Sequence, residues 1–481
     1  MSEKTLKEKT AKGLFWGGIG NGIQQILNLL FGIFLARMLT PADYGMIGML
    51  SIFIAIANNL QESGFIVTLA NRKNVTHDDY NSVFWFSLIV GVILYIILFF
   101  TAPLIALYYR QPEITPLARL LFLSFVISST MTTQSAYLFR NLMVKEKAIS
   151  QFPALTISGT VGIIMAYNGM SYWGIATQSL LYITVISICF WYFSPWRPTL
   201  SFKLQPIKEM FGFSSRVLLT NIFTQVNNNI FSAIIGRVYT PRDVGLYTQS
   251  NKWNYLCSSL VSGTVNSVAQ PVLAQTGSET ARQANIFRRM LQFSAYLSFP
   301  VMLGLALIAP EFIHITITDK WMECVPLLQM LCIWGAFMPI TTLYTNLIMS
   351  HGKSNIYMWN TIATGLSQII AILIVYPYGL KTMIAVYVAI NCLWIVIWHY
   401  FARKEIKISL FLIMRDIFPY IGASAITMVF TYFMTQSISN PIALMTAKIL
   451  IAAIIYFSIM QLSGSIIQKE AIGFLIKKNK K

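Results

Sequence analysis

Apolar residues in this chain are concentrated in runs of about 20, and this pattern constrains the fold more than any other feature. A helix of that length spans the roughly 30 Å hydrocarbon core of a bilayer, at about 1.5 Å per residue. Hydrophobic residues make up 56% of the 481 residues and charged residues only 11%, which is more apolar surface than a soluble core needs. We therefore expect an all-α, polytopic membrane protein.

The runs predict about fourteen transmembrane helices joined by short connections. We expect these helices at residues 13–38, 44–69, 82–102, 117–139, 150–169, 172–193, 211–236, 244–270, 290–310, 325–349, 355–377, 380–400, 413–435 and 441–462. The first run begins after Lys12 without a small-residue cleavage site. It is predicted to be a retained helix and not a signal peptide.

The net charge of +18 is accounted for by its distribution along the chain. With the N-terminus in the cytoplasm, 26 of the 35 Lys and Arg residues fall on the cytoplasmic side of the predicted spans. Such an excess follows the positive-inside rule. The basic residues form no single face, so we predict no nucleic-acid partner. Both termini are expected in the cytoplasm.

The sequence predicts no metal and no cofactor. The five cysteines show no paired spacing and the four histidines are far apart, which favours neither disulfides nor a zinc site. Gly352, Lys353 and Ser354 resemble the end of a phosphate-binding loop, but Leu347 occupies the position where that loop requires glycine. Active transport would therefore draw on an ion gradient or on the metabolic flux of the substrate.

The chain contains an internal duplication with an offset of 200 residues. LARMLTPADYG at 35–45 aligns with IGRVYTPRDVG at 235–245, and nine of the 25 positions from 21 to 45 are identical in the second copy. Six predicted spans precede the second copy, so both copies enter the membrane in the same direction. Parallel repeats of this kind are a transporter architecture, and the substrate site is expected between the halves.

The duplication predicts three parts. They are an N-terminal six-helix lobe at 1–205, a C-terminal six-helix lobe at 206–405, and two additional transmembrane helices with a basic cytoplasmic tail at 406–481. The two additional helices have no counterpart in the repeat. The sequence offers no explanation of what they do.

The repeated Thr-Pro-x-Asp motif is interpreted as a helix cap. Threonine suits the cap position, proline the first helical position, and aspartate the third, where its carboxylate meets free N–H groups and the positive end of the helix dipole. The residues are Thr40, Pro41 and Asp43 in the first copy, and Thr240, Pro241 and Asp243 in the second. We expect this motif to mark the fold and not an active site.

Each copy also carries a stripe of amides on one face of its first helix. The stripes are Asn21, Gln25 and Asn28, and Asn221, Gln225 and Asn228. Amides are costly against lipid, so these should face the bundle interior, either as hydrogen bonds between helices or as the lining of a wet cavity. Asn227 and Asn229, which replace leucines of the first copy, favour the cavity.

Three charged residues lie inside predicted spans and are not shared by the two copies. They are Glu62, Arg216 and Lys252. A charge at membrane depth costs on the order of 3 kcal/mol on insertion scales, so it needs a reason. Glu62 is a candidate for proton or Na⁺ coupling or a structural carboxylate, and Arg216 and Lys252 are candidates for substrate binding or for snorkelling to the headgroups.

The layout of two six-helix lobes plus two helices, and the Ala-Arg-x-Leu-Thr-Pro-x-Asp-Tyr-Gly block at 36–45 with its second copy, resemble the polysaccharide transporter family of the multidrug/oligosaccharidyl-lipid/polysaccharide (MOP) flippase superfamily. The similarity to Wzx and WzxC-like flippases covers nearly the whole chain. It implies two lobes around a central cavity that alternates between inward-open and outward-open states.

The resemblance also implies a substrate. Members of this family move undecaprenyl-diphosphate-linked oligosaccharide from the cytoplasmic to the periplasmic leaflet of the bacterial inner membrane, for lipopolysaccharide, O-antigen or exopolysaccharide biosynthesis. Cationic residues such as Arg216 and Lys252 would then hold the diphosphate. Implied partners are the bilayer, H⁺ or Na⁺ as coupling ion, and the polymerase and assembly proteins of the pathway.

Other functions stay open on the sequence alone. A multidrug or organic-cation antiporter of the same superfamily more often uses deep acidic residues, and only Glu62 qualifies. A peptidoglycan lipid-precursor flippase is a nearer alternative. A membrane glycosyltransferase or polysaccharide polymerase usually needs a sizeable outer loop, whereas the outer connections here are about 15 residues or shorter. We therefore predict a transporter and not an enzyme.

Overall fold

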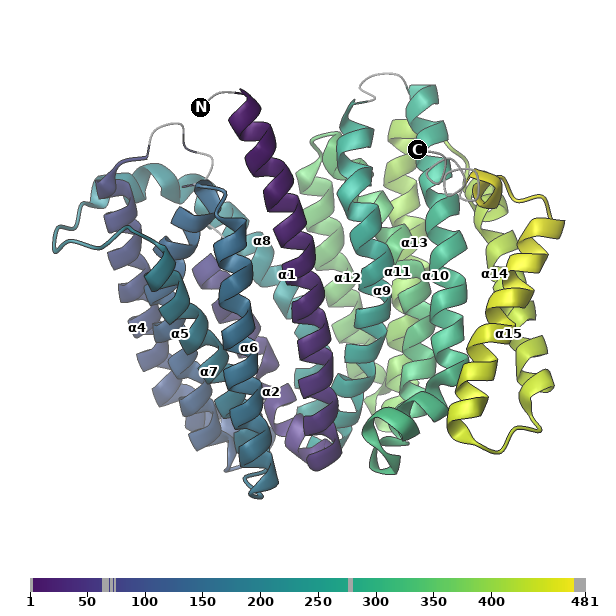
Figure 1. Ribbon diagram of the computed structural model, residues 1–481, viewed down its shortest axis with the longest axis horizontal. Helices are drawn as coiled ribbons and strands as arrows, with labels where there is room; N and C mark the ends of the chain where they lie inside the picture. The colour runs from purple at the N-terminus through teal and green to yellow at the C-terminus, as the bar shows by residue number, and fades with distance from the viewer. Residues whose placement is uncertain (1–2, 63–68, 70–71, 73–74, 276–279, 471–481) are drawn as a thin grey trace. The chain divides into compact units, whose positions relative to one another are not determined.

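The computed structural model describes residues 3–62, 69, 72, 75–275 and 280–470. Within its helices, the side chains of residues 3–15, 17–19, 21, 57–62, 209–220, 267–268, 270–271 and 274–275 lie outside the described part. All regular structure in these ranges is helical (Figure 1). Fourteen α-helices are present there, one at each predicted span, which confirms the fold class.

The helices extend beyond most of the predicted spans, because polar turns at their ends continue the helix past the apolar run. The first seven are α1 (Glu3–Met38), α2 (Pro41–Glu62), α4 (His77–Tyr109), α5 (Ile114–Arg140), α6 (Val144–Tyr167), α7 (Tyr172–Phe193) and α8 (Leu204–Val238). The others are α9 (Pro241–Gln275), α10 (Thr280–Ile317), α11 (Cys324–Ser350), α12 (Ser354–Val375), α13 (Leu380–Ile406), α14 (Leu410–Thr435) and α15 (Pro441–Leu462).

Helix α4 illustrates how its ends are set. Thr76 and Asp79 form a capping box: the backbone N–H of Thr76 donates to the Asp79 carboxylate at 2.8 Å, and the Asp79 N–H donates to the Thr76 hydroxyl at 3.3 Å. At the other end Arg110 adopts a left-handed conformation with φ of 56° and stops the helix. The capped polar turn is why α4 starts five residues before its predicted span.

Ten of the helices are long and apolar enough to cross a membrane, counting described residues alone. The other four are α1, α2, α8 and α9, which are the first two helices of each copy of the repeat. Shorter apolar stretches, Gly22–Met38 and Pro41–Ile56, remain in α1 and α2.

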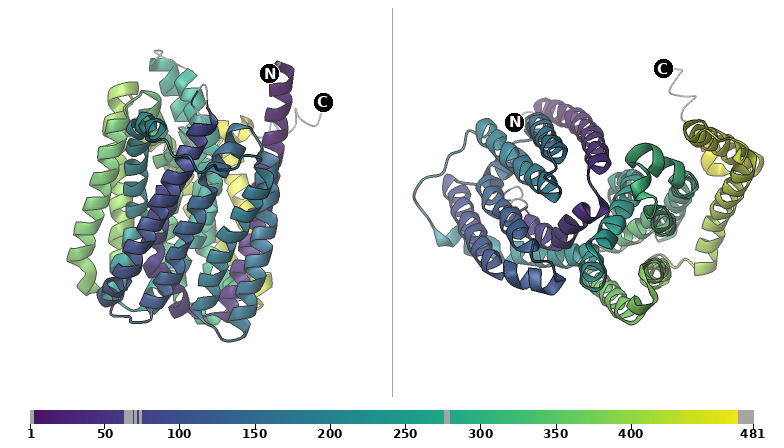
Figure 2. Two further views of the ribbon diagram at one scale, coloured as in Figure 1. Left: turned by 90° about the vertical axis from the view of Figure 1, so that its left-hand side faces the viewer. Right: turned by 90° about the horizontal axis from the view of Figure 1, so that it is seen from below.

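By its internal contacts the chain divides into two compact units, Met1–Gly245 and Leu246–Lys481. In the first unit α1 packs on α6, α2 packs on α8 and α5, and α4 packs on α5 (Figure 2). The α1–α6 contact is close, because a Cβ atom at Gly20 would overlap that of Ala148, and one at Gly159 would overlap the Phe31 ring. The division into lobes at residues 205 and 405 stays a prediction.

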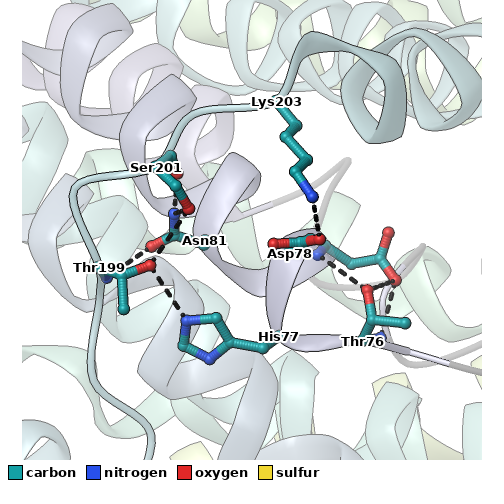
Figure 3. Close-up of polar contacts among 8 residues, drawn as sticks. Thr76, His77, Asp78, Asn81, Thr199, Ser201 and Lys203 are labelled. Carbon is teal, nitrogen blue, oxygen red and sulfur yellow. Dashed lines mark hydrogen bonds and ion pairs between the residues drawn. The ribbon is translucent and has the colours of Figure 1, made fainter.

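The segment between α7 and α8 is pinned to the first two turns of α4 (Figure 3). Asn81 accepts from the Thr199 backbone N–H at 2.8 Å and donates to the Ser201 carbonyl. Lys203 forms an ion pair of 2.6 Å with Asp78. The connection between the two copies of the repeat is therefore a specifically bound strap and not a free tether.

In the second unit, ion pairs hold α14 and α15 against α10. Arg288 of α10 binds both carboxylate oxygens of Asp416 at 2.6 and 2.9 Å, and Gln292 donates to the same carboxylate at 2.7 Å. Further along α10, Glu311 accepts from Lys448 of α15 at 2.7 Å. These contacts explain how the two additional helices are held, a point on which the sequence was silent.

Candidate functional site

A cavity of about 670 Å³ lies inside the first unit, surrounded by α1, α2, α5, α6 and α7. Ligand sites typically have volumes of about 300–1,000 Å³, so this space is large enough for a small molecule or part of a larger one. Its walls come from helices of a membrane bundle, where polar groups are costly unless they face water, a ligand or another polar group. The composition of the walls therefore indicates what the cavity holds.

Four amide side chains line the cavity. Gln24 and Asn28 come from α1, Gln151 from α6 and Gln178 from α7. Their spacing of four residues in α1 places the first two on one helix face. Within the described residues none of the four makes a hydrogen bond to the protein, so their donors and acceptors are available to an occupant.

Hydroxyl groups form a second part of the lining. Ser128 and Thr132 of α5 and Ser158 of α6 are buried, and each donates to a backbone carbonyl of its own helix, at 2.7, 3.2 and 3.3 Å. Such back-bonding uses the hydroxyl proton and leaves oxygen lone pairs that can still accept a hydrogen bond. The cavity thus offers donors from amides and acceptors from both amides and hydroxyls.

Lys147 is the one charged side chain among the described lining residues. It lies in the first turn of α6, and its Nζ is 3.4 Å from the Ser135 hydroxyl of α5. The same ammonium lies 5.7 Å from the ring centroids of Phe139 and Phe190. No acid is found among the described lining residues.

The predicted amide stripes are only partly brought together. Asn28 lines the cavity, whereas Gln25 is exposed outside it and the Asn21 side chain lies outside the described residues. In the second copy Gln225 is half-buried and accepts from the Asn229 side chain through its backbone carbonyl at 3.0 Å. Asn221 is half-buried and Asn228 is exposed. The stripe in α1 therefore contributes one of its three members to this site.

The predicted charged residues lie elsewhere. The side chains of Glu62 and Arg216 lie outside the described residues, although both positions belong to helices, α2 and α8. Lys252 is half-buried in α9 of the second unit, with its Nζ 5.9 Å from the Trp253 ring centroid. The roles proposed for these three residues stay predictions.

The Thr-Pro-x-Asp motif forms a reciprocal cap in both copies. The Thr40 backbone N–H and hydroxyl donate to the Asp43 carboxylate at 2.8 and 2.7 Å, and the Asp43 N–H donates to the Thr40 hydroxyl at 3.4 Å. Thr240 and Asp243 make the same three bonds at 3.1, 2.6 and 3.3 Å. The second Asp43 oxygen accepts from Ser171, which ties the cap to the turn before α7.

The two copies of the motif also contact each other, inside the first unit. A Cβ atom at Gly45 would overlap the carbonyl oxygen of Pro241, and a Cβ atom at Gly245 would overlap the carbonyl oxygen of Pro41. Only glycine fits at either place, because the obstacle is backbone and not a movable side chain. We call this pair of approaches the reciprocal motif contact.

Neighbouring residues extend the reciprocal motif contact. Gly236 of α8 packs so closely against Met49 and Tyr109 that a Cβ atom there would meet both side chains. Arg237 donates to the Tyr108 carbonyl at 2.8 Å and lies 5.3 Å from the Tyr108 ring centroid. Helices α2, α4 and α8 are therefore closely packed around Gly236 and Arg237.

Sequence reasoning missed most of the cavity lining. Lys147 was assigned to a cytoplasmic connection because the predicted span began only at residue 150. A usable signal existed: Lys147, Gln151, Leu155 and Ser158 follow at intervals of four, four and three, which places them on one face of α6. What the sequence could not supply is which faces of five helices converge.

A family profile described as "Polysaccharide biosynthesis protein" matches residues 34–326. The chain belongs to this family. The match spans α2, α4 to α10 and most of the cavity lining, so the site lies within the part of the chain that the family shares. It also includes both copies of the Thr-Pro-x-Asp motif.

Two curated proteins and one solved structure are similar to this chain. It is 24% identical over 359 residues to the lipopolysaccharide biosynthesis protein WzxC of Escherichia coli K12, covering 73% of this chain and 72% of that protein. It is 24% identical over 421 residues to the teichuronic acid biosynthesis protein TuaB of Bacillus subtilis 168, covering 84% and 85%.

The solved structure is the lipid II flippase MurJ in its inward closed conformation. It superposes with a TM-score of 0.76 at 15% sequence identity, covering 95% of this chain and 99% of that one. This similarity shows the fold, which agrees with the fold class expected from the sequence. The chain is thus a multi-pass membrane protein of the polysaccharide biosynthesis family.

Proposed function

We propose that this protein translocates undecaprenyl-diphosphate-linked oligosaccharide from the cytoplasmic to the periplasmic leaflet of the bacterial inner membrane. The observation that carries the proposal is the polar cavity of the first unit. Amides and hydroxyls with unused hydrogen-bonding capacity at membrane depth match the donors and acceptors of sugar hydroxyl groups. Lipid tails offer no such partners.

The lining of the cavity favours this substrate over an organic cation. Its described lining contains no acid, so it offers no carboxylate to pair with a cationic compound, whereas its amides and hydroxyls suit a saccharide. The family membership and the names of WzxC and TuaB, which belong to lipopolysaccharide and teichuronic acid biosynthesis, support the same class.

In this proposal the substrate crosses the membrane by alternating access. With both termini in the cytoplasm, as the excess of basic residues favours, the ends of α1 and α8 face the periplasm. The reciprocal motif contact closes this end, so release of the substrate requires Gly45 to separate from Pro241 and Gly245 from Pro41. Glu62 remains a candidate for H⁺ or Na⁺ coupling, and Arg216 and Lys252 for the diphosphate. Contacts with the polymerase and assembly proteins belong to the same proposal.

The test is reconstitution in liposomes that contain a fluorescent lipid-linked oligosaccharide, with and without a proton or Na⁺ gradient. Quenching of the outer-leaflet fluorescence by an impermeant reductant measures exchange between leaflets. We expect exchange that exceeds that of protein-free liposomes. No exchange with any glycan tried would contradict the proposal.

Adjacent residues of α1 provide a matched pair of variants. Gln24 lines the cavity and Gln25 does not. We expect Gln24→Leu to slow exchange severalfold, because a hydrogen bond contributes about 1 kcal/mol, and Gln25→Leu to leave it unchanged. The reverse result would assign the substrate to the other face of α1.

A further inference from the structure

The strap between α7 and α8, residues 194–203, holds an apolar side chain away from the protein. Leu200 is 94% exposed. Both of its neighbours are bound to Asn81 of α4, Thr199 through its backbone N–H and Ser201 through its carbonyl (Figure 3). The backbone on either side of Leu200 is therefore fixed, while its side chain stays uncovered.

Contacts with α4 place the strap at the depth where the apolar part of that helix begins. The Trp85 indole N–H donates to the Thr199 carbonyl at 2.7 Å. Trp85 lies about 12 Å along α4 from its first residue, His77, at about 1.5 Å per residue. The long apolar run of this membrane-spanning helix starts just before it, at Val83. The strap thus runs beside the helix and not beyond its end, and it projects sideways from the first unit (Figures 1 and 2).

The side chains of the strap match the boundary between lipid headgroups and acyl chains. Phe202, like Leu200, is exposed. Three tryptophans lie in the strap or against it, Trp85, Trp191 and Trp196. Tryptophan is enriched at the two interfaces of a membrane, where its ring is apolar and its N–H polar. Exposed apolar side chains at this depth lose less by meeting lipid than by meeting water.

Basic side chains accompany the apolar ones. Arg197 is exposed in the strap, with its guanidinium carbon 5.8 Å from the Trp191 ring centroid, and Lys208 is exposed in the second turn of α8. Neither forms an ion pair with a residue that the structure describes. With the termini in the cytoplasm, the strap faces the cytoplasmic leaflet, whose anionic lipids attract Lys and Arg. An acidic soluble protein would suit these charges but not the depth of the strap.

We infer that the strap binds the cytoplasmic leaflet of the membrane. Leu200 and Phe202 insert among the acyl chains, and Arg197 and Lys208 bind anionic lipid headgroups. The inference goes beyond the proposed function and does not depend on it, because it concerns how the connection between the two copies of the repeat is held. The connection is then fixed on two sides, to α4 by hydrogen bonds and to the bilayer by its apolar tip.

The experiment locates position 200 relative to lipid and water. Leu200→Cys of the full chain is labelled with an environment-sensitive fluorophore and reconstituted in phosphatidylcholine liposomes, and the wild type, labelled alike, gives the background of its five free cysteines. The label is quenched by a lipid that carries a nitroxide on its acyl chain, or by iodide in the water. We expect strong quenching by the nitroxide lipid and weak quenching by iodide. Phe202→Cys should give the same result.

Asn141→Cys is the matched control. Asn141 is exposed in the turn that follows α5, on the same side of the membrane as the strap, and is polar. Its label should show the reverse, strong quenching by iodide and weak quenching by the nitroxide lipid. The ratio of the two quenching constants should differ severalfold between positions 200 and 141. All three substituted side chains are exposed, and the melting temperature of each variant is measured to show that it folds.

A second arm tests the headgroup charge. Adding phosphatidylglycerol to the liposomes should raise the quenching of the label at position 200 by the nitroxide lipid, because Arg197 and Lys208 draw the strap to an anionic surface. Arg197→Gln with Lys208→Gln should abolish that rise. Lys145→Gln, which removes an exposed basic residue at the start of α6, should keep it.

The outcomes decide between lipid and a soluble partner. If iodide quenches the label at position 200 as strongly as the label at position 141, Leu200 lies in water, the inference is wrong, and the surface is open to a soluble protein. If phosphatidylglycerol changes nothing, or if the Arg197 and Lys208 double variant keeps the rise, the role of the anionic headgroups is wrong. Failure of lipid exchange in the reconstituted protein would contradict the proposed function and leave these results unaffected.

Discussion

Replacing Lys448 by methionine is expected to detach α15 from α10. The Lys448 ammonium lies 2.7 Å from a Glu311 carboxylate oxygen and also donates to the Leu307 carbonyl at 3.3 Å. The two charged side chains are only 7% and 11% exposed. Removing one partner of a buried ion pair leaves an unpaired buried charge, which costs about 3–5 kcal/mol. We expect a loss of stability of this size in the single variant.

The double variant Lys448→Met with Glu311→Met should recover most of the loss. Replacing both charges of a buried pair by apolar side chains of similar volume is often neutral or stabilising. The coupling between the two substitutions, obtained from the double-mutant cycle, should therefore be about 2 kcal/mol or more. An exposed pair offers the comparison: Arg289 and Glu470 are 3.0 Å apart but 68% and 52% exposed, so Arg289→Met should cost less than about 1 kcal/mol.

The stabilities of the wild type and the variants are compared by thermal unfolding. Each purified protein is heated, and the fraction that stays folded is detected by size-exclusion chromatography. The wild type, Arg289→Met and the double variant should melt within a few degrees of one another, with Lys448→Met clearly below them. A single variant that melts with the wild type would refute the role of the ion pair. A double variant that melts below Lys448→Met would refute the argument from the unpaired charge.

Two further predictions concern the first unit. Gly45→Ala should reduce lipid translocation at least tenfold, because its Cβ atom would overlap the Pro241 carbonyl oxygen. Gly22→Ala is the control and should translocate as the wild type, because its Cβ atom would meet nothing within 4 Å. Equal rates in both variants would contradict the argument. Asn81→Ala should speed amide hydrogen exchange at Thr199 roughly tenfold, because the backbone N–H loses its side-chain acceptor; unchanged protection would mean that other contacts hold the strap.

The fold was predictable because the bilayer imposes a simple rule on the chain. Each apolar run of about 20 residues must satisfy its backbone as a helix, so fourteen runs predicted the fourteen helices now described. The ends were less predictable, because polar residues such as Thr76 and Asp79 continue a helix beyond its apolar run by capping it. The duplication could be detected in the sequence because the backbone geometry permits only glycine at corresponding positions of the two copies, Gly45 and Gly245.

The candidate site was predictable only in part. A stripe on one helix, such as that containing Gln25 and Asn28, can be found from spacing alone, but which side of that stripe meets a cavity depends on the rotation of the helix against its neighbours. That rotation brought Gln24 into the wall in place of Gln25. Lys147 escaped notice because a charge near a helix end has an ordinary explanation in the positive-inside rule.

The reciprocal motif contact has a consequence for the symmetry of the chain. Each copy of the segment supplies both halves of the contact, a glycine that is approached and a proline carbonyl that approaches it. A surface with this property is self-complementary, which is the condition for an isologous interface about a two-fold axis. The reciprocal motif contact thus has, within a single polypeptide, the geometry by which two identical half-length chains could pair.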